Sequence, residues 1–328
     1  MDVKDQLITE DYAIYNSDNM YVMSGMPDKS IDMSVYSPPF AGLYNYSSSP
    51  NDHSNCETKE QFLDTYEFVI SEIARLTKPG RITAVHCTNI KDSKTGDMWN
   101  LPAEIIRLHQ KHGFTWKDQI TIWKEPLKVR MRTMVRSLMH KLIVEDSTEC
   151  FTAMPDYILV FKKRGENKVP VEHPYGLKYY AGCRPFLPEH EDTYGDYELF
   201  RKKWANYTGD PKGNKLSHLT WQRYASSVWD DIRIDEVLQF KEGKDEDDEK
   251  HVHPLQLDVI DRCIELWSNP GETVFTPYMG VGSEVYSPVS MGRKAIGVEL
   301  KDSYYKQAIK NLSDVKKRFQ DDTQTKMF

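Results

Sequence analysis

The chain has 328 residues, of which 39% are hydrophobic and 28% are charged, and its formal net charge is -7. This length allows a full α/β core, built as one large domain with an insertion or as two smaller domains. The composition excludes a membrane-spanning helix, because no apolar run approaches the ~20 residues that such a helix needs. The acidic, polar start MDVKDQLITED is unlike a secretory signal, so we expect a cytoplasmic protein of a bacterial or phage-infected cell.

Cysteine usage and net charge bear on two further classes, namely disulfide-rich or metal-binding proteins and proteins whose surface is covered by nucleic acid. The cysteines are odd in number and widely spaced with no C-x-x-C pair, so we expect neither a disulfide framework nor a bound metal. The negative net charge argues mildly against a surface covered by nucleic acid, since non-specific affinity for DNA comes from Lys and Arg. One basic face is nevertheless enough for a DNA-acting enzyme, so the distribution of charge matters more than its sum.

Short β-type runs alternate with helical patterns along the chain, which is typical of a mixed sheet covered by helices. The expected strands are residues 12–15, 30–36, 81–86, 119–123, 157–161, 273–275 and 295–300. The expected helices are residues 59–76, 101–113, 254–267 and 302–312. The stretch 166–250 is rich in Tyr, Trp, Pro and Gly with few periodic runs, so it reads as an inserted, loop-rich region.

A glycine turn and an acidic residue point to a nucleoside site in the C-terminal part. PYMGVGSE (Pro277–Glu284) follows an expected strand and opens a helix, and Glu299 lies near the end of the next strand. Glycines let a backbone approach a ligand closely, and such a carboxylate can accept hydrogen bonds from ribose hydroxyls. The G-x-G-S pattern lacks the full dinucleotide fingerprint, and many glycine turns only end a strand, so both interpretations stand on this element alone.

A second candidate is SPPF (Ser37–Phe40), directly after the expected strand 30–36. Two consecutive prolines cannot donate to a sheet ladder, so they end the strand in a rigid corner. The alternative is a tight turn without a function. Position favours a site, because ligands of open α/β sheets bind beyond the C-terminal ends of strands.

Six segments together resemble the amino-methylating DNA methyltransferases, which act on N6 of adenine and N4 of cytosine. They are IDMSVYSPPF, ARLTKPGRI, ITIWKEP, PDYILVFKK, HPLQLDVIDRCIELWSNPGETVFTPYMGVGSE and RKAIGVELKDSYYKQAIKNL. Their order is that of the circularly permuted, beta-type arrangement. The resemblance implies a Rossmann-like fold that binds S-adenosylmethionine, with a mixed seven-stranded sheet flanked by helices. It also implies a catalytic half in 1–165, a target-recognition insertion in 166–250, a cofactor half in 251–315 and a tail in 316–328.

The resemblance assigns catalysis to Ser37, Pro38, Pro39 and Phe40. An exocyclic amino group is a poor nucleophile because its lone pair is delocalised into the ring. The Ser37 hydroxyl and the Pro38 carbonyl would accept its two hydrogens and direct the lone pair at the sulfonium methyl group, so that orientation and electrostatics supply the catalysis. Phe40 would stack on the base, which must leave the duplex to be reached.

For the cofactor, the resemblance implies seven binding residues, namely Asp18, Pro277, Tyr278, Gly280, Gly282, Ser283 and Glu299. Asp18 has an equally good alternative as a turn residue in NSDN. His253 matches the start of a family motif, although a simple helix-start residue is the preferred interpretation. Thr276 stands where the family usually has an acidic residue, and Tyr36 stands where threonine usually precedes the catalytic serine.

The implied substrate is double-stranded DNA, and a basic cluster between Trp123 and Tyr157 is the candidate contact. Its proposed DNA-binding residues are Lys128, Arg130, Arg132, Arg136 and Lys141, and Lys124 begins the same stretch. Arginine side chains bind phosphates and guanine edges well, which favours a contact with DNA. The alternative is that this cluster is a charged surface that contacts only solvent. The insertion's Tyr179, Tyr180, Trp204, Trp221 and Arg223 are candidates for target recognition or for a small local core.

The serine at position 37 favours N4-cytosine over N6-adenine, since the adenine enzymes more often carry Asp or Asn there. The alternatives are an RNA or protein-glutamine methyltransferase and a non-catalytic DNA-binding protein on the same fold. A homodimer and a cognate restriction endonuclease are partners that the resemblance leaves open.

Overall fold

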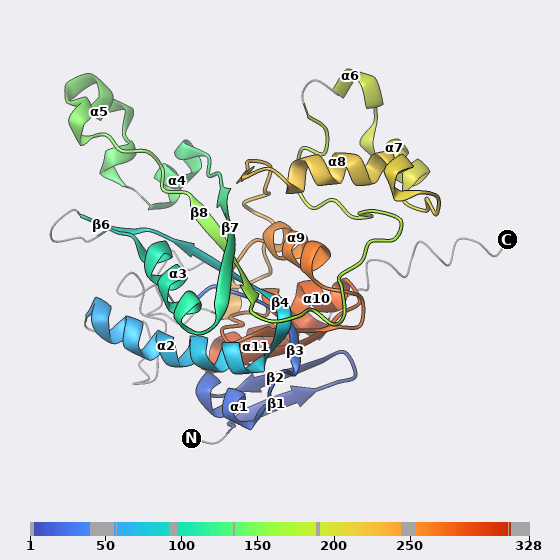
Figure 1. Ribbon diagram of the computed structural model, residues 1–328. Helices are drawn as coiled ribbons and strands as arrows, with labels where there is room; N and C mark the ends of the chain where they lie inside the picture. The colour runs from blue at the N-terminus through green and yellow to red at the C-terminus, as the bar shows by residue number, and fades with distance from the viewer. Residues whose placement is uncertain are drawn as a thin grey trace.

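A nine-stranded mixed sheet is the centre of the fold in the computed structural model (Figure 1). The structure describes residues 3–39, 56, 58–91, 97–133, 135–187, 191–243, 254–313 and 315. The strands, in their order across the sheet, are β1 (Asp5–Ile8), β2 (Tyr12–Asn16), β11 (Lys294–Glu299), β10 (Thr273–Thr276), β3 (Ile31–Tyr36), β4 (Thr77–Thr88), β8 (Asp156–Lys163), β7 (Phe114–Ile122) and β9 (Val228–Trp229). A separate pair joins β5 (Ile90–Lys91) to β6 (Met98–Trp99).

The seven strands expected from the sequence form the continuous middle of this sheet, from β2 to β7. Neighbours from β2 through β11, β10 and β3 to β4 are parallel, while β8 is antiparallel to both β4 and β7. The sequence did not predict the edge strands β1 and β9. β1 is almost wholly exposed and β9 has two residues, so neither carries an apolar alternation.

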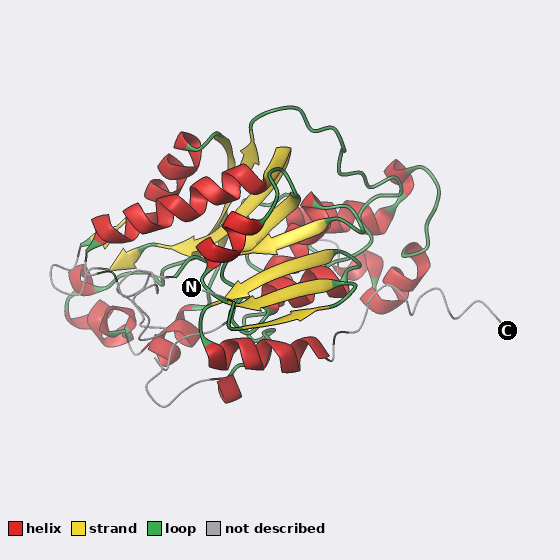
Figure 2. Cartoon of the chain, turned by 90° about the horizontal axis from the view of Figure 1, so that it is seen from below, coloured by secondary structure: helices red, strands yellow, loops and turns green. Residues whose placement is uncertain are grey.

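Helices cover both faces of the sheet (Figure 2). The helices α1 (Asn19–Gly25), α2 (Lys59–Leu76) and α3 (Leu101–Lys111) pack on one face. The helices α9 (Leu257–Trp267), α10 (Ser283–Ser290) and α11 (Asp302–Ser313) pack on the other face. The expectation that a helix begins at Pro254 was wrong by three residues, because Gln256 still has an extended backbone and α9 begins after it.

Helix α2 illustrates how the local sequence determines an element of this fold. Thr58 caps its N-terminus by accepting a hydrogen bond from the Gln61 backbone N–H at 3.1 Å. Its buried residues recur at spacings of three and four, which places one continuous apolar stripe on the sheet. They are Phe62, Tyr66, Val69, Ile70, Ile73, Ala74 and Leu76.

Side chains of β4 alternate between the two faces and so separate two cores. Val85 and Cys87 join the cluster under α2 and α3, whereas Ala84 joins the cluster under α9. His86 therefore faces the α9 side, between these apolar residues. The expected strand 81–86 is longer than predicted, since β4 already begins at Thr77, directly after α2.

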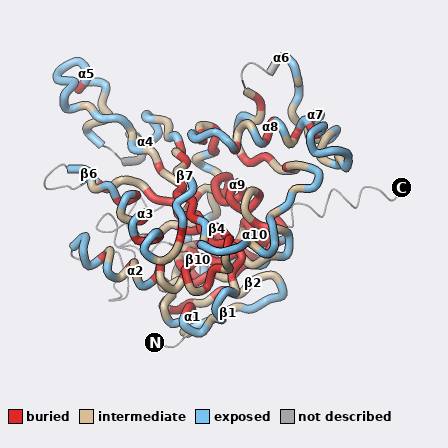
Figure 3. The backbone as a smooth tube through the Cα atoms, in the orientation of Figure 1, coloured by how far each residue is buried: buried red, intermediate tan, exposed pale blue. Residues whose placement is uncertain are grey.

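Two segments project from the same side of the sheet (Figure 1). One is the arm, residues 124–155, which contains α4 (Pro126–Thr133), η2 (Arg136–Leu138), α5 (His140–Glu145) and η3 (Ser147–Glu149). The other lies in the inserted region and contains α6 (Glu191–Tyr194), α7 (Tyr197–Trp204), η5 (Pro211–Gly213) and α8 (Lys215–Tyr224), followed later by η6 (Lys241–Gly243). The arm is largely exposed along its length (Figure 3).

The inserted region is fixed to the main body by a fully buried arginine. Arg262 of α9 lies 2.7 Å from Asp231 Oδ2, and its guanidinium group stacks 4.8 Å from the ring centroid of Tyr224 and 5.0 Å from that of Trp229. Trp229 belongs to β9, which pairs with β7. The end of the insertion therefore extends the sheet, while its helices form small cores of their own. None of the described helices is long and apolar enough to cross a membrane.

Candidate active site

The residues singled out from the sequence meet at one edge of the sheet. Because β2, β11, β10, β3 and β4 are parallel, their C-terminal ends lie at the same edge. β2 leads to Ser17 and Asp18, β11 ends at Glu299, and β10 leads into the glycine turn. β3 leads to Ser37, next to the end of β4.

The corner that the sequence predicts to be catalytic consists of Ser37, Pro38 and Pro39, directly after β3. The two ends of this corner are half-buried, and Pro38 between them is buried. Ser37 Oγ lies 2.6 Å from His86 Nδ1, which is a short hydrogen bond. The predicted stacking residue Phe40 lies outside the described residues.

His86 continues into a charged contact that sequence reasoning missed. Its Nε2 lies 3.1 Å from Asp156 Oδ2, and Lys124 Nζ lies 2.6 Å from Asp156 Oδ1. The contact between His86 Nε2 and Asp156 Oδ2 is close but is not a well-aligned hydrogen bond. Lys124 was expected to lie among the cations that could contact DNA. This needs correction, because its ammonium group forms an ion pair with Asp156.

Asp156 is held as a carboxylate despite its burial. Burial raises the pKa of a carboxyl group, but the positive charge of Lys124 and the contact with His86 more than offset this and hold the pKa of Asp156 well below its usual range. The site therefore contains a fixed negative charge beneath the histidine that contacts Ser37.

The glycine turn and Glu299 are joined by backbone hydrogen bonds. The Gly280 N–H donates to Glu299 Oε2 at 2.9 Å, and the Lys301 N–H donates to Glu299 Oε1 at 2.8 Å. Gly282 starts α10 with a φ of 98°, a conformation that favours glycine. Gly280 and Glu299, two of the residues predicted to bind the cofactor, are thus in direct contact.

The structure offers polar groups that fit a nucleoside-type ligand at this place. The Ser17 and Ser283 side-chain oxygens are buried and have no hydrogen-bond partner among the described residues. Buried hydroxyls are normally paired, so such atoms at a strand edge suit a polar ligand. At Gly280 an added Cβ would meet nothing within 4 Å, so the backbone there has open space beside it.

Asp18 has a structural role in addition to the predicted one. Its Oδ1 caps α1 by accepting from the backbone N–H groups of Met20 at 2.8 Å and Tyr21 at 3.4 Å. Asn19, the next residue, donates from Nδ2 to the Pro277 carbonyl at 3.3 Å. Asp18 therefore caps a helix, in line with its interpretation as a turn residue. Through Asn19, the capped helix also contacts the glycine turn.

The two departures from the family motifs have local explanations. The hydroxyl oxygen of Tyr36 lies 3.0 Å from that of Tyr66, and both rings are buried beneath the corner. The Tyr278 ring lies 6.0 Å from the Tyr36 ring, centroid to centroid. Thr276 is buried, and its Oγ1 accepts from the Tyr278 N–H at 3.4 Å. Tyr36 and Thr276 thus serve as packing and turn residues around the site.

The basic cluster lies on the arm, with its members in different environments. Lys128 is exposed and lies 3.5 Å from Asp235, Arg136 is exposed, and Lys141 pairs with Glu145 at 3.1 Å. Arg130 is half-buried. Arg132 is part of α4, but its side chain lies outside the described residues.

The aromatic candidates of the insertion divide into two groups. Tyr180 donates its hydroxyl to Asp231, and Arg223 lies 3.3 Å from the same carboxylate, so both serve the internal network around Arg262. Trp204 joins a small local core, whereas Trp221 is 58% exposed. Trp221 is therefore the large aromatic side chain of this set that remains available for an outside partner.

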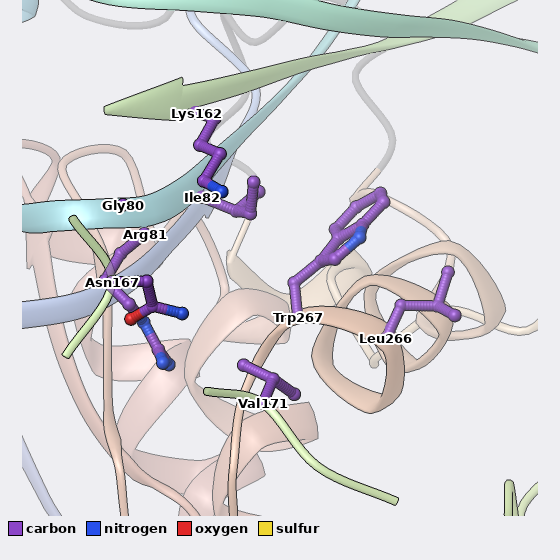
Figure 4. Close-up of a pocket in the computed structure, with 8 residues that line it drawn as sticks. All are labelled: Gly80, Arg81, Ile82, Lys162, Asn167, Val171, Leu266 and Trp267. Atoms are coloured by element: carbon purple, nitrogen blue, oxygen red, sulfur yellow. The ribbon is translucent and has the colours of Figure 1, made fainter. Parts of the chain in front are cut away.

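A separate cavity of about 170 Å³ lies near the start of β4 (Figure 4). It is bordered by Arg81 and Ile82 of β4 and by Trp267 of α9. Ile82 pairs with Met33, near the start of β3, whereas the catalytic corner follows the end of β3. The cavity is therefore distinct from the site described above.

The Rossmann-like fold, with a polar corner and a nucleoside-type turn at one strand edge, fits the class of S-adenosylmethionine-dependent methyltransferases. A family model described as DNA methylase, for N6- and N4-methyltransferases, matches residues 31–310. The chain belongs to this family, and it is a DNA methyltransferase that acts on amino groups.

Curated relatives support this assignment across most of the chain. The type II methyltransferase M.BglII of Bacillus subtilis is 25% identical over 309 residues, which cover 92% of this chain and 68% of the relative. The DNA adenine methyltransferase YhdJ of Escherichia coli (strain K12) is 23% identical over 305 residues, which cover 92% of this chain and 82% of the relative.

Solved structures share the fold. The PvuII DNA methyltransferase, which is cytosine-N4-specific, has a TM-score of 0.59 at 13% identity, covering 94% of this chain and 89% of that chain. TTHA0409 of Thermus thermophilus, in complex with S-adenosyl-L-methionine, has a TM-score of 0.55 at 20% identity, covering 90% and 92%. The relatives and structures include both an adenine enzyme and a cytosine-N4 enzyme, so they leave the target base open.

Proposed function

We propose that this chain methylates N4 of cytosine in double-stranded DNA. The observation that carries the proposal is the Ser37 hydroxyl, which lies 2.6 Å from His86 Nδ1 at the end of β3. A serine in the first position of this corner resembles the cytosine-N4 enzymes more than the adenine enzymes. The cytosine-N4-specific PvuII enzyme has the same fold, which is compatible with this choice.

At the corner, Ser37 and Pro38 bind the amino group of the flipped base. The two hydrogens of the amino nitrogen would be accepted by Ser37 Oγ and by the Pro38 carbonyl oxygen, which turns the nitrogen toward sp³ geometry. The rigid Pro38–Pro39 backbone keeps these two acceptors in place, so little reorganisation is needed during the reaction. Phe40 would stack on the base.

At the glycine turn, the chain binds the cofactor that supplies an electrophilic methyl group. Glu299 would accept hydrogen bonds from the ribose hydroxyls, since its two oxygens are already oriented by the N–H groups of Gly280 and Lys301. Gly280 and Gly282 would let the ligand approach the backbone, and Ser283 would hydrogen-bond to it. Pro277, Tyr278 and Asp18 would complete this binding surface.

The two projecting segments would hold the DNA. Lys128, Arg130, Arg132, Arg136 and Lys141 of the arm would contact phosphates, and Trp221 of the insertion would lie near the target. Both segments extend from the same side of the body (Figure 1), as a duplex placed against the site requires.

The test is to incubate the purified protein with radiolabelled S-adenosylmethionine and unmethylated genomic DNA, and to identify the labelled nucleoside by chromatography and mass. We expect label in N4-methylcytosine. Label in N6-methyladenine would overturn the base assignment and leave the roles of Ser37 and Pro38 standing. Label in RNA or in protein glutamine, with none in DNA, would overturn the assignment of DNA as the substrate.

A further inference from the structure

We propose that His86 accepts, through Ser37, the proton that the amino nitrogen loses during methyl transfer, with Asp156 and Lys124 stabilising the charge that forms. This inference rests on the proposed role of Ser37. It adds three side chains to the reaction, from β4, β8 and the loop after β7.

The sheet register places these residues on one face. Tyr36 pairs with Val85, so the following residues, Ser37 and His86, lie side by side. Thr88 of β4 pairs with Asp156, which makes His86 and Asp156 diagonal neighbours across the β4–β8 ladder. Such neighbours lie within reach of long side chains.

The same relation repeats on the next strand. Asp156 pairs with Ile122 of β7, so Lys124, two residues further on, lies diagonally from Asp156 on the same face. The result is a continuous line of contacts at 2.6, 3.1 and 2.6 Å, from Ser37 Oγ through the two nitrogens of His86 and the two oxygens of Asp156 to Lys124 Nζ. Each of these residues uses a different atom for each contact.

The contacts select one tautomer of His86. Asp156 is a carboxylate that can only accept, so the hydrogen of neutral His86 belongs on Nε2. Nδ1 then carries the lone pair, and the Ser37 hydroxyl donates to it. This fixes the hydroxyl hydrogen away from the substrate, and the oxygen lone pairs of Ser37 are left to accept a hydrogen of the amino group.

The proton balance follows from this arrangement. As the nitrogen–methyl bond forms, the bond between the methyl carbon and sulfur breaks, its electron pair stays on sulfur, and the amino nitrogen becomes positively charged. The nitrogen then gives one proton to Ser37 Oγ while Ser37 gives its own proton to His86 Nδ1. The products are a neutral methylamino group, a thioether and an imidazolium, whose proton later passes to water.

The charges around His86 suit a group that becomes cationic. The structure places Asp156 from β8 against His86, and Lys124 lies beyond Asp156; Cys87, the neighbouring residue on β4, faces the opposite core. Burial opposes the ionisation of Asp156, yet Lys124 and the contact with His86 hold its pKa well below the ordinary range, so a carboxylate lies beside His86. An imidazolium at His86 therefore forms beside a fixed negative charge.

The experiment measures single-turnover methylation of DNA as a function of pH, with the enzyme in excess and saturating S-adenosylmethionine. The variant His86→Asn keeps an acceptor near the position of Nδ1, so Ser37 stays oriented, but it cannot take up a proton. We expect its rate to fall by about 100-fold, the lower end for a proton-transfer group. The wild-type rate should decline on the acid side of its pH profile, whereas the variant should lose this decline.

A second variant separates proton uptake from simple positioning. Asp156→Asn removes the negative charge, so an imidazolium is harder to form, and the acid limb of the rate profile should move to lower pH. The control His112→Asn changes a histidine that pairs with Glu67 away from the site, and it should leave the profile unchanged. Unfolding curves and S-adenosylmethionine affinity identify a variant that is merely misfolded.

The outcomes separate this inference from the proposed function. An acid limb that persists unchanged in His86→Asn would overturn the proton route, whichever base the product analysis identifies. A wild-type enzyme that labels no DNA would instead overturn the proposed function. A lower rate with an unaltered pH profile in both variants would reduce His86 and Asp156 to structural supports of Ser37.

Discussion

The backbone N–H of Gly280 donates to Glu299 Oε2 across 2.9 Å, which joins the glycine turn after β10 to the acidic residue that ends β11. Gly280 follows β10 and Glu299 ends β11, and these two strands are parallel neighbours, with Thr276 paired to Gly297. The turn and the carboxylate therefore form one rigid unit. A ligand that binds one of them also meets the other.

Glu299→Gln should weaken the binding of S-adenosylmethionine. The amide replaces one charged acceptor, and hydrogen bonds to a charged group contribute about 1.5–3 kcal/mol, which corresponds to roughly a ten- to hundredfold rise in Kd. Titration calorimetry measures this. Asp302→Asn is the control, because Asp302 is an exposed partner of Lys4. Equal affinities for Glu299→Gln and the wild type would remove Glu299 from the cofactor site.

Gly280→Ala and Gly282→Ala should impair different properties of the protein, namely cofactor affinity and stability, respectively. Both residues have positive φ, so alanine is strained at either position by roughly 1 kcal/mol. A Cβ at Gly282 would also lie 3.2 Å from the Ala308 Cβ of α11, which forces the α10–α11 contact apart. We expect Gly282→Ala to lower the unfolding midpoint more, and Gly280→Ala to lose more cofactor affinity. Thermal unfolding with and without the cofactor tests this; the reverse ranking contradicts it.

The sequence predicts those parts of the site whose residues lie close together along the chain. Ser37 and the glycine turn lie in short motifs at strand ends, and the end of a strand can be located from apolar runs alone. Their meeting at one edge then follows from parallel strands. The middle seven strands were predictable for the same reason.

The contacts of His86 were not predictable in this way. His86 and Asp156 come from β4 and β8 and Lys124 from the loop after β7, and only the cross-strand register brings them together. A shift by one residue would send each side chain to the other face, so predicting these contacts requires knowing which strands pair and in which register. Lys124 was assigned to the basic cluster for this reason, since its sequence neighbours are Arg and Lys residues of the arm.

We expect a buried carboxyl group in the first turn of α10, next to the glycine turn, to make the stability of the protein depend on pH. Burial, with a smaller effect of Glu299, raises the pKa of Glu284 from 4.5 to about 8. The folded state therefore holds its proton more tightly than the unfolded state, so this contribution is fully present below pH 4.5 and is lost as the pH rises to about 8.

Replacing this group should remove that contribution. We expect the free energy of unfolding of the wild type, relative to Glu284→Gln, to decrease as the pH rises across this window. Urea unfolding of both proteins at several pH values measures the difference. A difference that is constant with pH would show that Glu284 titrates alike in the folded and unfolded states.

The buried pair of Arg262 and Asp231 should control how the insertion is held. Asp231→Asn leaves the fully buried guanidinium without its counter-charge, which costs about 3–5 kcal/mol in comparable cases. The neighbouring change Asp230→Asn affects a half-exposed pair with Arg184, worth at most about 1 kcal/mol. Urea unfolding compares the two variants, and similar losses would show that the charge of Asp231 is not what fixes the insertion.

The arm should contribute to DNA affinity through phosphate contacts. Arg136 is exposed on η2, so Arg136→Ala removes a cation without removing buried packing. Each phosphate contact adds about 0.9 to the slope of log affinity against log salt concentration. We therefore expect weaker binding at low salt and a slope that is smaller by about one.

Binding isotherms at several salt concentrations measure this slope, with Lys294→Ala as the matched control. Lys294 is exposed at the start of β11, at the end of the sheet away from the catalytic corner. Its removal changes the net charge by the same amount, so a general charge effect would lower both slopes equally. A smaller slope in Arg136→Ala alone places a phosphate at the arm, because counterions are released only where the duplex lies against the protein.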